Sequence, residues 1–503
     1  MAPDVTGATP QSSRDPADFE FSAREMRAMA DAVVARVIAH VVSLPGQPVR
    51  GDVHAEDLCR AMREPVPDAP SPLEPLLRAY FDDWLPRSFT APHPGYLAYV
   101  PGGGVFPAAL ADFIADATNR FTGIFSPAPA LVQLEANALD WIRDWMQFPP
   151  AARGLFTTGG SMSNFNAVLC ARERHLGPDI RAGVLYASTQ VHHCVPKAAK
   201  AAGILPDRVR FVAVDERFRL RLDALERAVA EDRARGLRPF FVVCSAGTVN
   251  TGAVDPIEAV ADVCAREGLW LHVDGAYGGF FHAVPELRPC LAGLPRADSL
   301  TLDPHKGLFL PYGTGCLLVR DGAALRAAHA LPVEAAYLPN TVDPEEFYDP
   351  SAHGPDLSRG FPGLRVWLSL KLFGAAKYRA ALAEKRALAL DAADRIGRIP
   401  GVVVAAPPEL SLFAFHLHWP GATLDDENDA TRDLLERVVR RQRVFLTGCS
   451  VGGRFLARVC VLSFRTRRAS IDHCVSDVAE EAAGLLAARA PTPVSRRWSS
   501  AGA

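Results

Sequence analysis

Residues 299–315 read SLTLDPHKGLFLPYGTG, and this stretch places a lysine between two apolar segments. Lys306 comes after the apolar run SLTL (299–302), separated from it by an aspartate, a proline and a histidine. Lysine is rarely buried, because removing an ammonium group from water is costly. The pattern therefore indicates a short β-strand that ends next to a reactive amine.

The composition is that of a globular protein with more than one domain. The chain has 503 residues, which exceeds the length at which a single core stops growing. Its formal net charge of −3 argues against a nucleic-acid or membrane-surface binder. Ten cysteines without a CxxC pair fit the reduced thiols of a cytoplasmic protein. The acidic N-terminus is unlike a secretory signal, and no uninterrupted apolar run approaches the roughly 20 residues of a membrane span.

Apolar periodicity predicts the order of helices and strands. Spacing of apolar residues predicts a helix over 21–44. From about 106 to 320, helix-like segments alternate with short β-rich runs, which is typical of an α/β domain with a largely parallel sheet. The expected strands are 183–188, 208–214, 239–246, 268–273 and 299–302.

These patterns divide the chain into four parts. Residues 1–105 are expected to form a helical segment and the way into the site, and residues 106–385 a large domain. Residues 386–490 mix strand-like and helical pieces and predict a small α+β domain, and 491–503 a loose tail. The segment 331–361 is rich in proline and acid and lacks periodicity, so we expect a long loop there that is either an active-site lid or a surface excursion.

Polar residues follow several of the expected strands, where ligands bind in open α/β sheets. Asp274 follows the strand 268–273, and if it stood alone, an N-cap or a plain ion pair would be the favoured explanation. The turn at 159–161 opens directly into a helix, whose first amides suit an anion. His192 lies near another helix start, and the loop 245–257 offers threonine hydroxyls.

An amine, a carboxylate, an anion site and an imidazole are together the parts that hold pyridoxal phosphate. Lysine forms a Schiff base with the aldehyde, an aspartate keeps the pyridine nitrogen protonated, and a helix start takes the phosphate. The protonated ring withdraws electrons, so a bond at the substrate α-carbon can break. We therefore predict that Lys306 is a nucleophile and Asp274 the partner of the ring nitrogen.

These motifs resemble those of group II pyridoxal-phosphate-dependent decarboxylases, which act on aromatic amino acids, glutamate or histidine. The resemblance runs from about residue 90 to 380. DPHK (303–306) matches the family's Asn-Pro-His-Lys, HVDGAY (272–277) its His-Val-Asp-Ala-Ala-Tyr, and GGSMSN (159–164) its Gly-Ser-Ala-Ser. The resemblance implies an α/β enzyme of fold type I, which is the aspartate-aminotransferase-like fold. It also implies that the enzyme works as a homodimer on a small amino-acid substrate.

The resemblance also implies roles for single residues. The implied catalytic residues are Lys306, His192, Tyr337 and Asp274. The implied cofactor-binding residues are Lys306, Asp274, Ala276, His192, Met162, Ser163, Ser161, Thr248, His305 and Asp303. The implied substrate-binding residues are Tyr99, Pro101, Gly102 and Phe121, the last across the dimer interface. No metal is expected.

Two departures from the family pattern bear on the substrate. Asp303 stands where the family has asparagine, and Gly102 stands where animal aromatic decarboxylases carry threonine. The expected pocket contains Tyr99, Phe121 and Phe125 and offers no further cation for a side-chain carboxylate. An aromatic or bulky apolar L-amino acid is therefore favoured over glutamate.

The expected reaction is decarboxylation to the amine and carbon dioxide, and its nearest alternative is an aldehyde synthase. Tyr337 favours the amine, because it matches the family's catalytic tyrosine, which aldehyde synthases replace by phenylalanine. An aminotransferase would instead protonate the cofactor carbon. A nicotinamide enzyme would need GxGxxG between a strand and a helix, and the sequence has none. The run 192–194 lacks further ligands at the spacing of a metal site.

Overall fold

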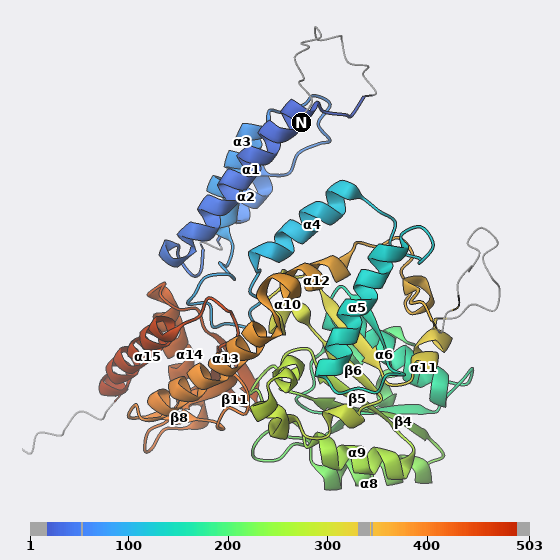
Figure 1. The fold of residues 1–503 in the computed structure, drawn as a ribbon. Helices are drawn as coiled ribbons and strands as arrows, with labels where there is room; N and C mark the ends of the chain where they lie inside the picture. The colour runs from blue at the N-terminus through green and yellow to red at the C-terminus, as the bar shows by residue number, and fades with distance from the viewer. Residues whose placement is uncertain (1–17, 52–53, 330–342, 344–345, 490–503) are drawn as a thin grey trace, which may run out of the picture. The chain divides into compact units, whose positions relative to one another are not determined.

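The computed structural model describes residues 18–51, 54–329, 343 and 346–489. The chain divides into two compact units, one up to Thr90 and one from Ala91 onward (Figure 1). Helix α13 (Ala375–Gly397) runs through the boundary predicted at 385. The predicted tail lies outside the described residues, and so do residues 331–342 and 344–345 of the predicted lid, which include Tyr337.

The first unit is helical. Its elements are α1 (Ala23–Ser43), α2 (Glu56–Ala61), α3 (Leu73–Arg78) and a π-helical turn (Ala79–Trp84). The Ser22 side chain and Glu25 form a capping box at the start of α1, which satisfies amides that the helix itself leaves unpaired. Arg36 of α1 pairs with Asp82 at 2.6 Å, fixing α1 against the π-helical turn. The helix predicted over 21–44 is thus confirmed.

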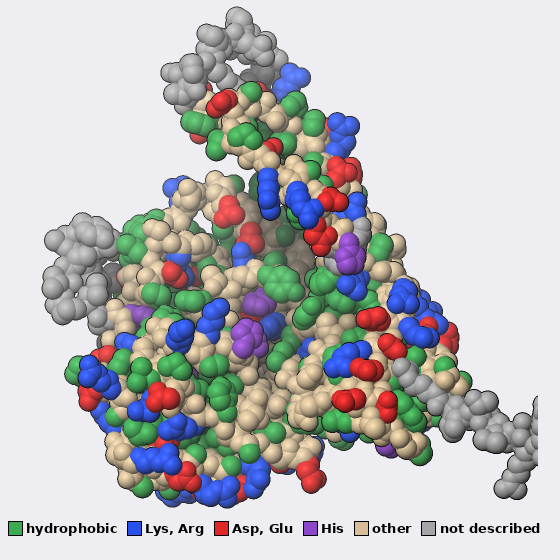
Figure 2. Space-filling model, turned by 180° about the vertical axis from the view of Figure 1, so that it is seen from behind, with side chains coloured by type: hydrophobic (Ala, Val, Ile, Leu, Met, Phe, Trp, Pro, Cys, Tyr) green, Lys and Arg blue, Asp and Glu red, His purple; other side chains and the backbone are tan. Residues whose placement is uncertain are grey.

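Helix α1 keeps a row of apolar side chains in contact with solvent. None of its residues is buried, and its exposed large apolar residues are Met26, Met29, Val33, Val34, Ile38 and Val42. Figure 2 shows hydrophobic side chains interleaved with charged ones on the visible face of this unit. By length and composition alone, Ala23–Gly46 could cross a membrane, with a mean hydropathy of 1.5. Asp31 and Arg36 interrupt this stretch, so it is not an uninterrupted apolar run of the kind that the sequence was expected to lack.

The second unit is built on a seven-stranded sheet in the order β1-β7-β6-β5-β4-β2-β3. The strands are β1 (Arg153–Thr157), β2 (Gly183–Ser188), β3 (Val209–Val212), β4 (Arg238–Ser245), β5 (Trp270–Gly275), β6 (Ser299–Leu302) and β7 (Gly315–Val319). Only β7 runs antiparallel to its neighbours β1 and β6. The predicted α/β fold of type I is confirmed, although β1 and β7 were not among the expected strands.

Helices cover both faces of this sheet (Figure 1). The remaining helices around it are α4 (Phe106–Thr118), α5 (Pro129–Trp145), α6 (Gly160–His175), α7 (Cys194–Ala201), α8 (Leu222–Ala234), α9 (Ile257–Glu267), α10 (Pro304–Gly307), α11 (Gly322–Ala327) and α12 (Pro362–Phe373). One core lies between the sheet and α6, α7 and α11, and a second between the sheet and α5, α8 and α9. Because apolar side chains cover both faces, the central strands read as continuous hydrophobic runs.

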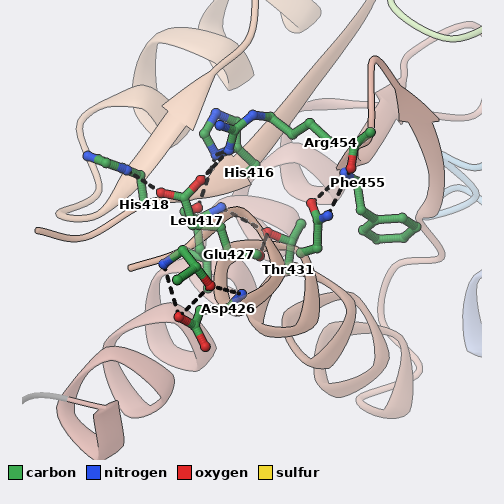
Figure 3. Close-up of polar contacts among 11 residues, drawn as sticks. His416, Leu417, His418, Asp426, Glu427, Thr431, Arg454 and Phe455 are labelled. Atoms are coloured by element: carbon green, nitrogen blue, oxygen red, sulfur yellow. Dashed lines mark hydrogen bonds and ion pairs between the residues drawn. The ribbon is translucent and has the colours of Figure 1, made fainter. Parts of the chain in front are cut away.

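A smaller antiparallel sheet follows, in the order β10-β11-β9-β8. Its elements are β8 (Val402–Val404), β9 (Leu412–Leu417), α14 (Leu424–Arg440), β10 (Thr447–Val451), β11 (Arg454–Cys460) and α15 (Arg468–Arg489). Glu427 of α14 is buried and accepts hydrogen bonds from His418 and Arg454 (Figure 3). The Leu417 amide donates to the Thr431 hydroxyl at 3.0 Å, so polar contacts join α14 to the sheet.

Candidate active site

A cavity of about 450 Å³ lies at the carboxyl ends of β4, β5 and β6. Parallel strands end at the same edge of a sheet, which brings residues from distant parts of the chain together. The predicted residues in its wall are Tyr99, Ser161, His192, Thr248, Asp274, Ala276, Asp303, His305 and Lys306. The predicted residues outside its wall are Pro101, Gly102, Phe121, Met162 and Ser163. Tyr337 lies outside the described residues.

Lys306 lies on the single turn α10, between β6 and β7. Its Nζ is 2.7 Å from Oδ2 of Asp303, a carboxylate that is only 1% exposed. Burial lowers the pKa of Lys306, but the adjacent Asp303 carboxylate outweighs burial, and the pKa is raised overall. The other carboxylate oxygen of Asp303, Oδ1, has no hydrogen-bond partner among the described residues. The aspartate that replaces the family's asparagine therefore holds the lysine as an ammonium group.

Asp274 ends β5 and is held by uncharged donors. Its Oδ1 accepts from the amide of Ala276 at 3.1 Å, and its Oδ2 accepts from Nδ2 of Asn164 at 3.1 Å. It makes no ion pair with another described residue. A buried carboxylate without a cationic partner is costly, so this position suits a cationic ligand in the cavity.

His192 enters the cavity wall from the start of α7. Its Nδ1 accepts a hydrogen bond from the amide of Cys194 at 3.2 Å, which orients the ring. Burial lowers the pKa of His192, which favours the neutral imidazole. Its neighbour His193 is exposed, with the two ring centroids 4.2 Å apart. A neutral ring in a cavity wall can stack on a flat ligand.

The start of α6 forms another part of the wall, through residues 158–161. Gly159 has a φ of 153°, which side chains rarely tolerate, so the turn into the helix requires glycine. The Met162 amide donates to the Gly159 carbonyl at 3.0 Å, and the Ser163 hydroxyl is fully buried, 2.8 Å from that of Thr157. The first helical residues, Gly160 and Ser161, line the cavity. The anion contacts predicted for Met162 and Ser163 stay predictions.

His305 and Thr248 complete the wall on either side of the lysine. His305 is buried, and its Nδ1 is 2.8 Å from the carbonyl of Thr314, so this nitrogen carries the proton of the neutral ring. Burial lowers the pKa of His305, although Asp303 counteracts it. The Thr248 hydroxyl is 3.0 Å from that of Thr251. Both residues lie where a ligand bound to Lys306 would meet them.

The predicted substrate segment enters the wall mainly through Tyr99. This residue has a φ of 50°, an uncommon conformation for a bulky side chain, and is 49% exposed. A Cβ on Gly102 would lie 2.7 Å from the carbonyl oxygen of His305, so this backbone has no room for the threonine of animal relatives. Phe121 is 41% exposed, and the ring of Phe125 packs against Phe347 instead of the cavity.

Sequence reasoning missed several residues of the site. Asn164, Cys194 and Tyr312 line the cavity. Buried Arg458 donates to the carbonyls of Val249 and Tyr99, which also line it. One signal was available, since Asn164 is a poor helix former that ends the motif GGSMSN (159–164). Tyr312 belongs to the same stretch as Lys306 (299–315), so its position beside the lysine was a further signal, whereas Arg458 carries no local signal because it reaches the site only through the fold.

The residues present fit pyridoxal phosphate. The cavity combines a lysine amine, a carboxylate without a cationic partner, a neutral imidazole and the start of the 16-residue helix α6. These groups match the aldehyde, the pyridinium, the ring face and the phosphate of that cofactor. Fold and site together define a pyridoxal-phosphate-dependent enzyme of fold type I.

Comparisons with known proteins agree. The family described as pyridoxal-dependent decarboxylase conserved domain matches residues 56–418. The aromatic-L-amino-acid decarboxylase of Bacillus atrophaeus is 33% identical over 89% of this chain and 94% of its own. The phenylacetaldehyde synthase of Petunia hybrida is 29% identical over 87% of this chain and 90% of its own. The crystal structure of Oryza sativa TDC with PLP and tryptamine has a TM-score of 0.88 and 26% identity, covering 93% of this chain and all of that one.

The chain therefore belongs to the pyridoxal-dependent decarboxylases, and it is similar to their aromatic-L-amino-acid branch. The predicted family and cofactor are confirmed.

Proposed function

We propose that the protein decarboxylates an aromatic L-amino acid to its amine and carbon dioxide. The observation that carries the proposal is the single cavity that holds Lys306 and the unpaired carboxylate of Asp274 beside the aromatic side chains of Tyr99 and Tyr312. The relatives named for aromatic amino acids support the substrate class.

When bound, the cofactor supplies a protonated aromatic ring that accepts the electron pair left behind by departing carbon dioxide. The protein would hold this group by Lys306 at the aldehyde and by Asp274 at the ring nitrogen. His192 and Ala276 would cover the two ring faces, and the first amides of α6 would hold the phosphate. Asp303 would keep a proton on the Lys306 nitrogen whenever that nitrogen is free.

The cofactor assignment has a direct spectroscopic test. Purified protein should show a visible absorption band from cofactor bound to Lys306, and Lys306→Ala should lack it. A matched control is Lys385→Ala, since Lys385 is a buried lysine that donates to the Thr466 carbonyl at 2.6 Å, away from the cavity wall. That variant should keep the band if it folds. A wild-type band that survives Lys306→Ala would rule out Lys306.

The cavity wall supports the proposed substrate class. Tyr99, Val100 and Tyr312 present aromatic and apolar surface to a bound amino acid. Tyr99 is positioned by Arg458, which holds its carbonyl. Measuring carbon dioxide release from the twenty amino acids and from hydroxylated aromatic ones tests this. Turnover of glutamate above that of every aromatic amino acid would contradict the proposed class.

A second candidate function is favoured by the similarity to an aldehyde synthase. We assign Tyr337 as the donor of the proton to the substrate α-carbon, because a phenol on a closed lid can deliver one proton and exclude oxygen. Tyr337→Phe should then divert turnover to aldehyde, with peroxide and ammonia. Chromatography and a peroxide assay distinguish the products. Wild-type protein that yields mainly aldehyde would overturn the amine assignment.

The active species is proposed to be a homodimer in the cytoplasm. Leu110, Phe113 and Ile114 of α4 and the following Phe121 are exposed, as expected of a face that a second copy covers. The ten cysteines are all free, which fits a reducing compartment. Sedimentation should give a dimer and Phe113→Asp a weakened one. A fully active wild-type monomer would rule the dimer out.

A further inference from the structure

A chain of buried polar side chains lies behind Asp274, on the face of the sheet that α6 covers. Trp270, His272 and Asp274 alternate along β5 and so point to the same face. In the register of β5 with β6, His272 lies opposite Ser299 and Asp274 opposite Thr301. Asn164 reaches this row from α6. All of these side chains are at most 8% exposed, so water does not satisfy their polar atoms.

Four hydrogen bonds connect this chain from end to end. The indole nitrogen of Trp270 donates to the Ser299 hydroxyl at 2.7 Å. That hydroxyl is 2.8 Å from Nδ1 of His272. Nε2 of His272 is 2.7 Å from Oδ1 of Asn164, and Nδ2 of Asn164 is 3.1 Å from Oδ2 of Asp274. Thr301 adds a bond of 3.2 Å to Oδ1 of Asn164.

The two ends of this row of side chains, Trp270 and Asp274, determine the direction of every hydrogen bond in it. An indole can only donate, and a carboxylate can only accept. Asn164 must therefore turn its NH₂ group to Asp274 and its oxygen to His272. The ring then donates from Nε2, and Nδ1 accepts from the Ser299 hydroxyl. Each donor finds one acceptor, so the row is fully satisfied in a single arrangement.

Apart from Asp274, the side chains of this hydrogen-bonded row carry no charge. Burial lowers the pKa of His272 to about 4, so its ring is neutral at ordinary pH. The ring stacks on Phe241, with centroids 5.5 Å apart and planes 18° apart, which fixes its tilt. The thiol of Cys194 accepts a bond from Asn164 at 3.2 Å, and burial raises the pKa of that thiol to about 12. The groups facing Asn164 and His272 are thus neutral except for Asp274.

We propose that Asn164 and His272 are positioning residues that hold the Asp274 carboxylate ready for the protonated ring nitrogen of the cofactor. Neutral donors fix the orientation of Asp274 without supplying a positive charge that would compete with that nitrogen. The inference rests on the proposed role of Asp274 and extends it to two residues that act through the Asp274 carboxylate.

The test uses holoenzyme loaded with pyridoxal phosphate labelled with nitrogen-15 in its ring. The nitrogen chemical shift reports whether the ring is protonated, which a purely structural role of Asn164 would leave unchanged. In wild type we expect the protonated value. In Asn164→Leu we expect a shift toward the unprotonated value at neutral pH, and turnover reduced by about 10- to 100-fold, as for outer partners of other reactive groups.

His272 provides a matched pair of variants. His272→Gln retains a donor toward Asn164 and should keep the protonated shift, whereas His272→Phe fills the space without a donor and should lose it. Thr301→Val removes a hydroxyl from the same buried row but not the bond to Asp274, so it should resemble wild type. If Asn164→Leu does not fold, the two His272 variants decide the question.

The outcomes separate the inference from its premise. Folded Asn164→Leu or His272→Phe holoenzyme with the wild-type shift and turnover would overturn the positioning role. Asp274→Asn holoenzyme that keeps the protonated shift would instead overturn the role of Asp274 itself, and with it the inference. A lost shift in Asn164→Leu and His272→Phe, restored in His272→Gln, supports both.

Discussion

Two buried carboxylates in the second unit are held in opposite ways. Glu427, 4% exposed, accepts from the charged Arg454 and from His418, and its partners come from the small sheet around it (Figure 3). Asp274, 8% exposed, accepts only from an amide side chain and a backbone amide. Glu427 has a cationic partner within the protein, whereas Asp274 has none among the described residues and can pair with a cation in the cavity.

If Asp274 has its proposed role, this difference separates a structural carboxylate from a functional one. A buried ion pair that is fully formed contributes to the fold and offers nothing further to bind. A carboxylate that is oriented but not neutralised keeps its charge available to a cation in the cavity. Exchanging each group for its neutral amide should therefore affect different properties of the protein.

The largest expected effect is that of Asp274→Asn on turnover. An amide cannot stabilise a protonated ring nitrogen, so kcat should fall by about 10²–10³, or about 2.7–4 kcal/mol of transition-state stabilisation. The variant should keep bound cofactor, measured by its absorption, and the wild-type melting temperature. Turnover close to wild type would remove the distinction between the two carboxylates.

Glu427→Gln should show the reverse pattern. The amide keeps the shape but loses the charge-assisted bonds, so the free energy of unfolding should fall by about 1–2 kcal/mol. We take the low end because Arg454 and His418 are partly exposed. Urea denaturation measures the loss, with kcat unchanged as the internal control. A large drop in kcat with an unchanged free energy of unfolding would contradict the structural role assigned to Glu427.

The contribution of Glu427 should also depend on pH. Burial raises the pKa of Glu427, but hydrogen bonds from Arg454 and His418 outweigh it and the pKa is lowered overall. A lowered pKa in the folded state gives stability that is present above the unfolded value of about 4.3 and lost as pH falls through the folded value. The stability difference between wild type and Glu427→Gln should thus shrink below about pH 4.3. Urea titrations from neutral pH to well below about pH 4.3 measure this, and a difference that stays constant or grows as the pH falls would contradict it.

The smallest expected effect is that of Cys194→Ser. The thiol lies beside the Asn164 amide that holds Asp274, but it is a neutral and weak acceptor, and a hydroxyl can take its place. Turnover should change by less than about fivefold, or ~1 kcal/mol. Steady-state kinetics with an aromatic substrate measure it. A loss as large as that of Asp274→Asn would mean that the thiol takes part in the chemistry.

The sequence predicts those features that depend on residues close together in the chain. The strand at 183–188 is found at its observed bounds, because a continuous apolar run between turns has few other structures. Lys306 and Asp274 are identified because both interrupt buried segments with charge. The antiparallel strand β7 is not found, since direction within a sheet leaves no mark on five apolar residues.

Long-range contacts explain what the sequence does not predict. Asn164 and Asp274 are 110 residues apart, and their hydrogen bond exists only because α6 crosses β5. Phe125 has the aromatic character expected of a pocket residue, but its ring packs on that of Phe347. These two residues are far apart in the sequence, so only the fold brings them together. The burial of the Ser163 hydroxyl against Thr157 likewise depends on how the turn enters α6.

The order of strands in the large sheet has a consequence for refolding. Strands β6 and β7 lie between β1 and β5, so the walls of the cavity meet only after segments distant in the chain have paired. Such non-local pairing forms late and slowly, because loop closure must precede the contacts that reward it. A partly folded chain therefore has no cofactor site. Added pyridoxal phosphate should raise the yield and the melting temperature of refolded protein by mass action, without accelerating the folding step itself.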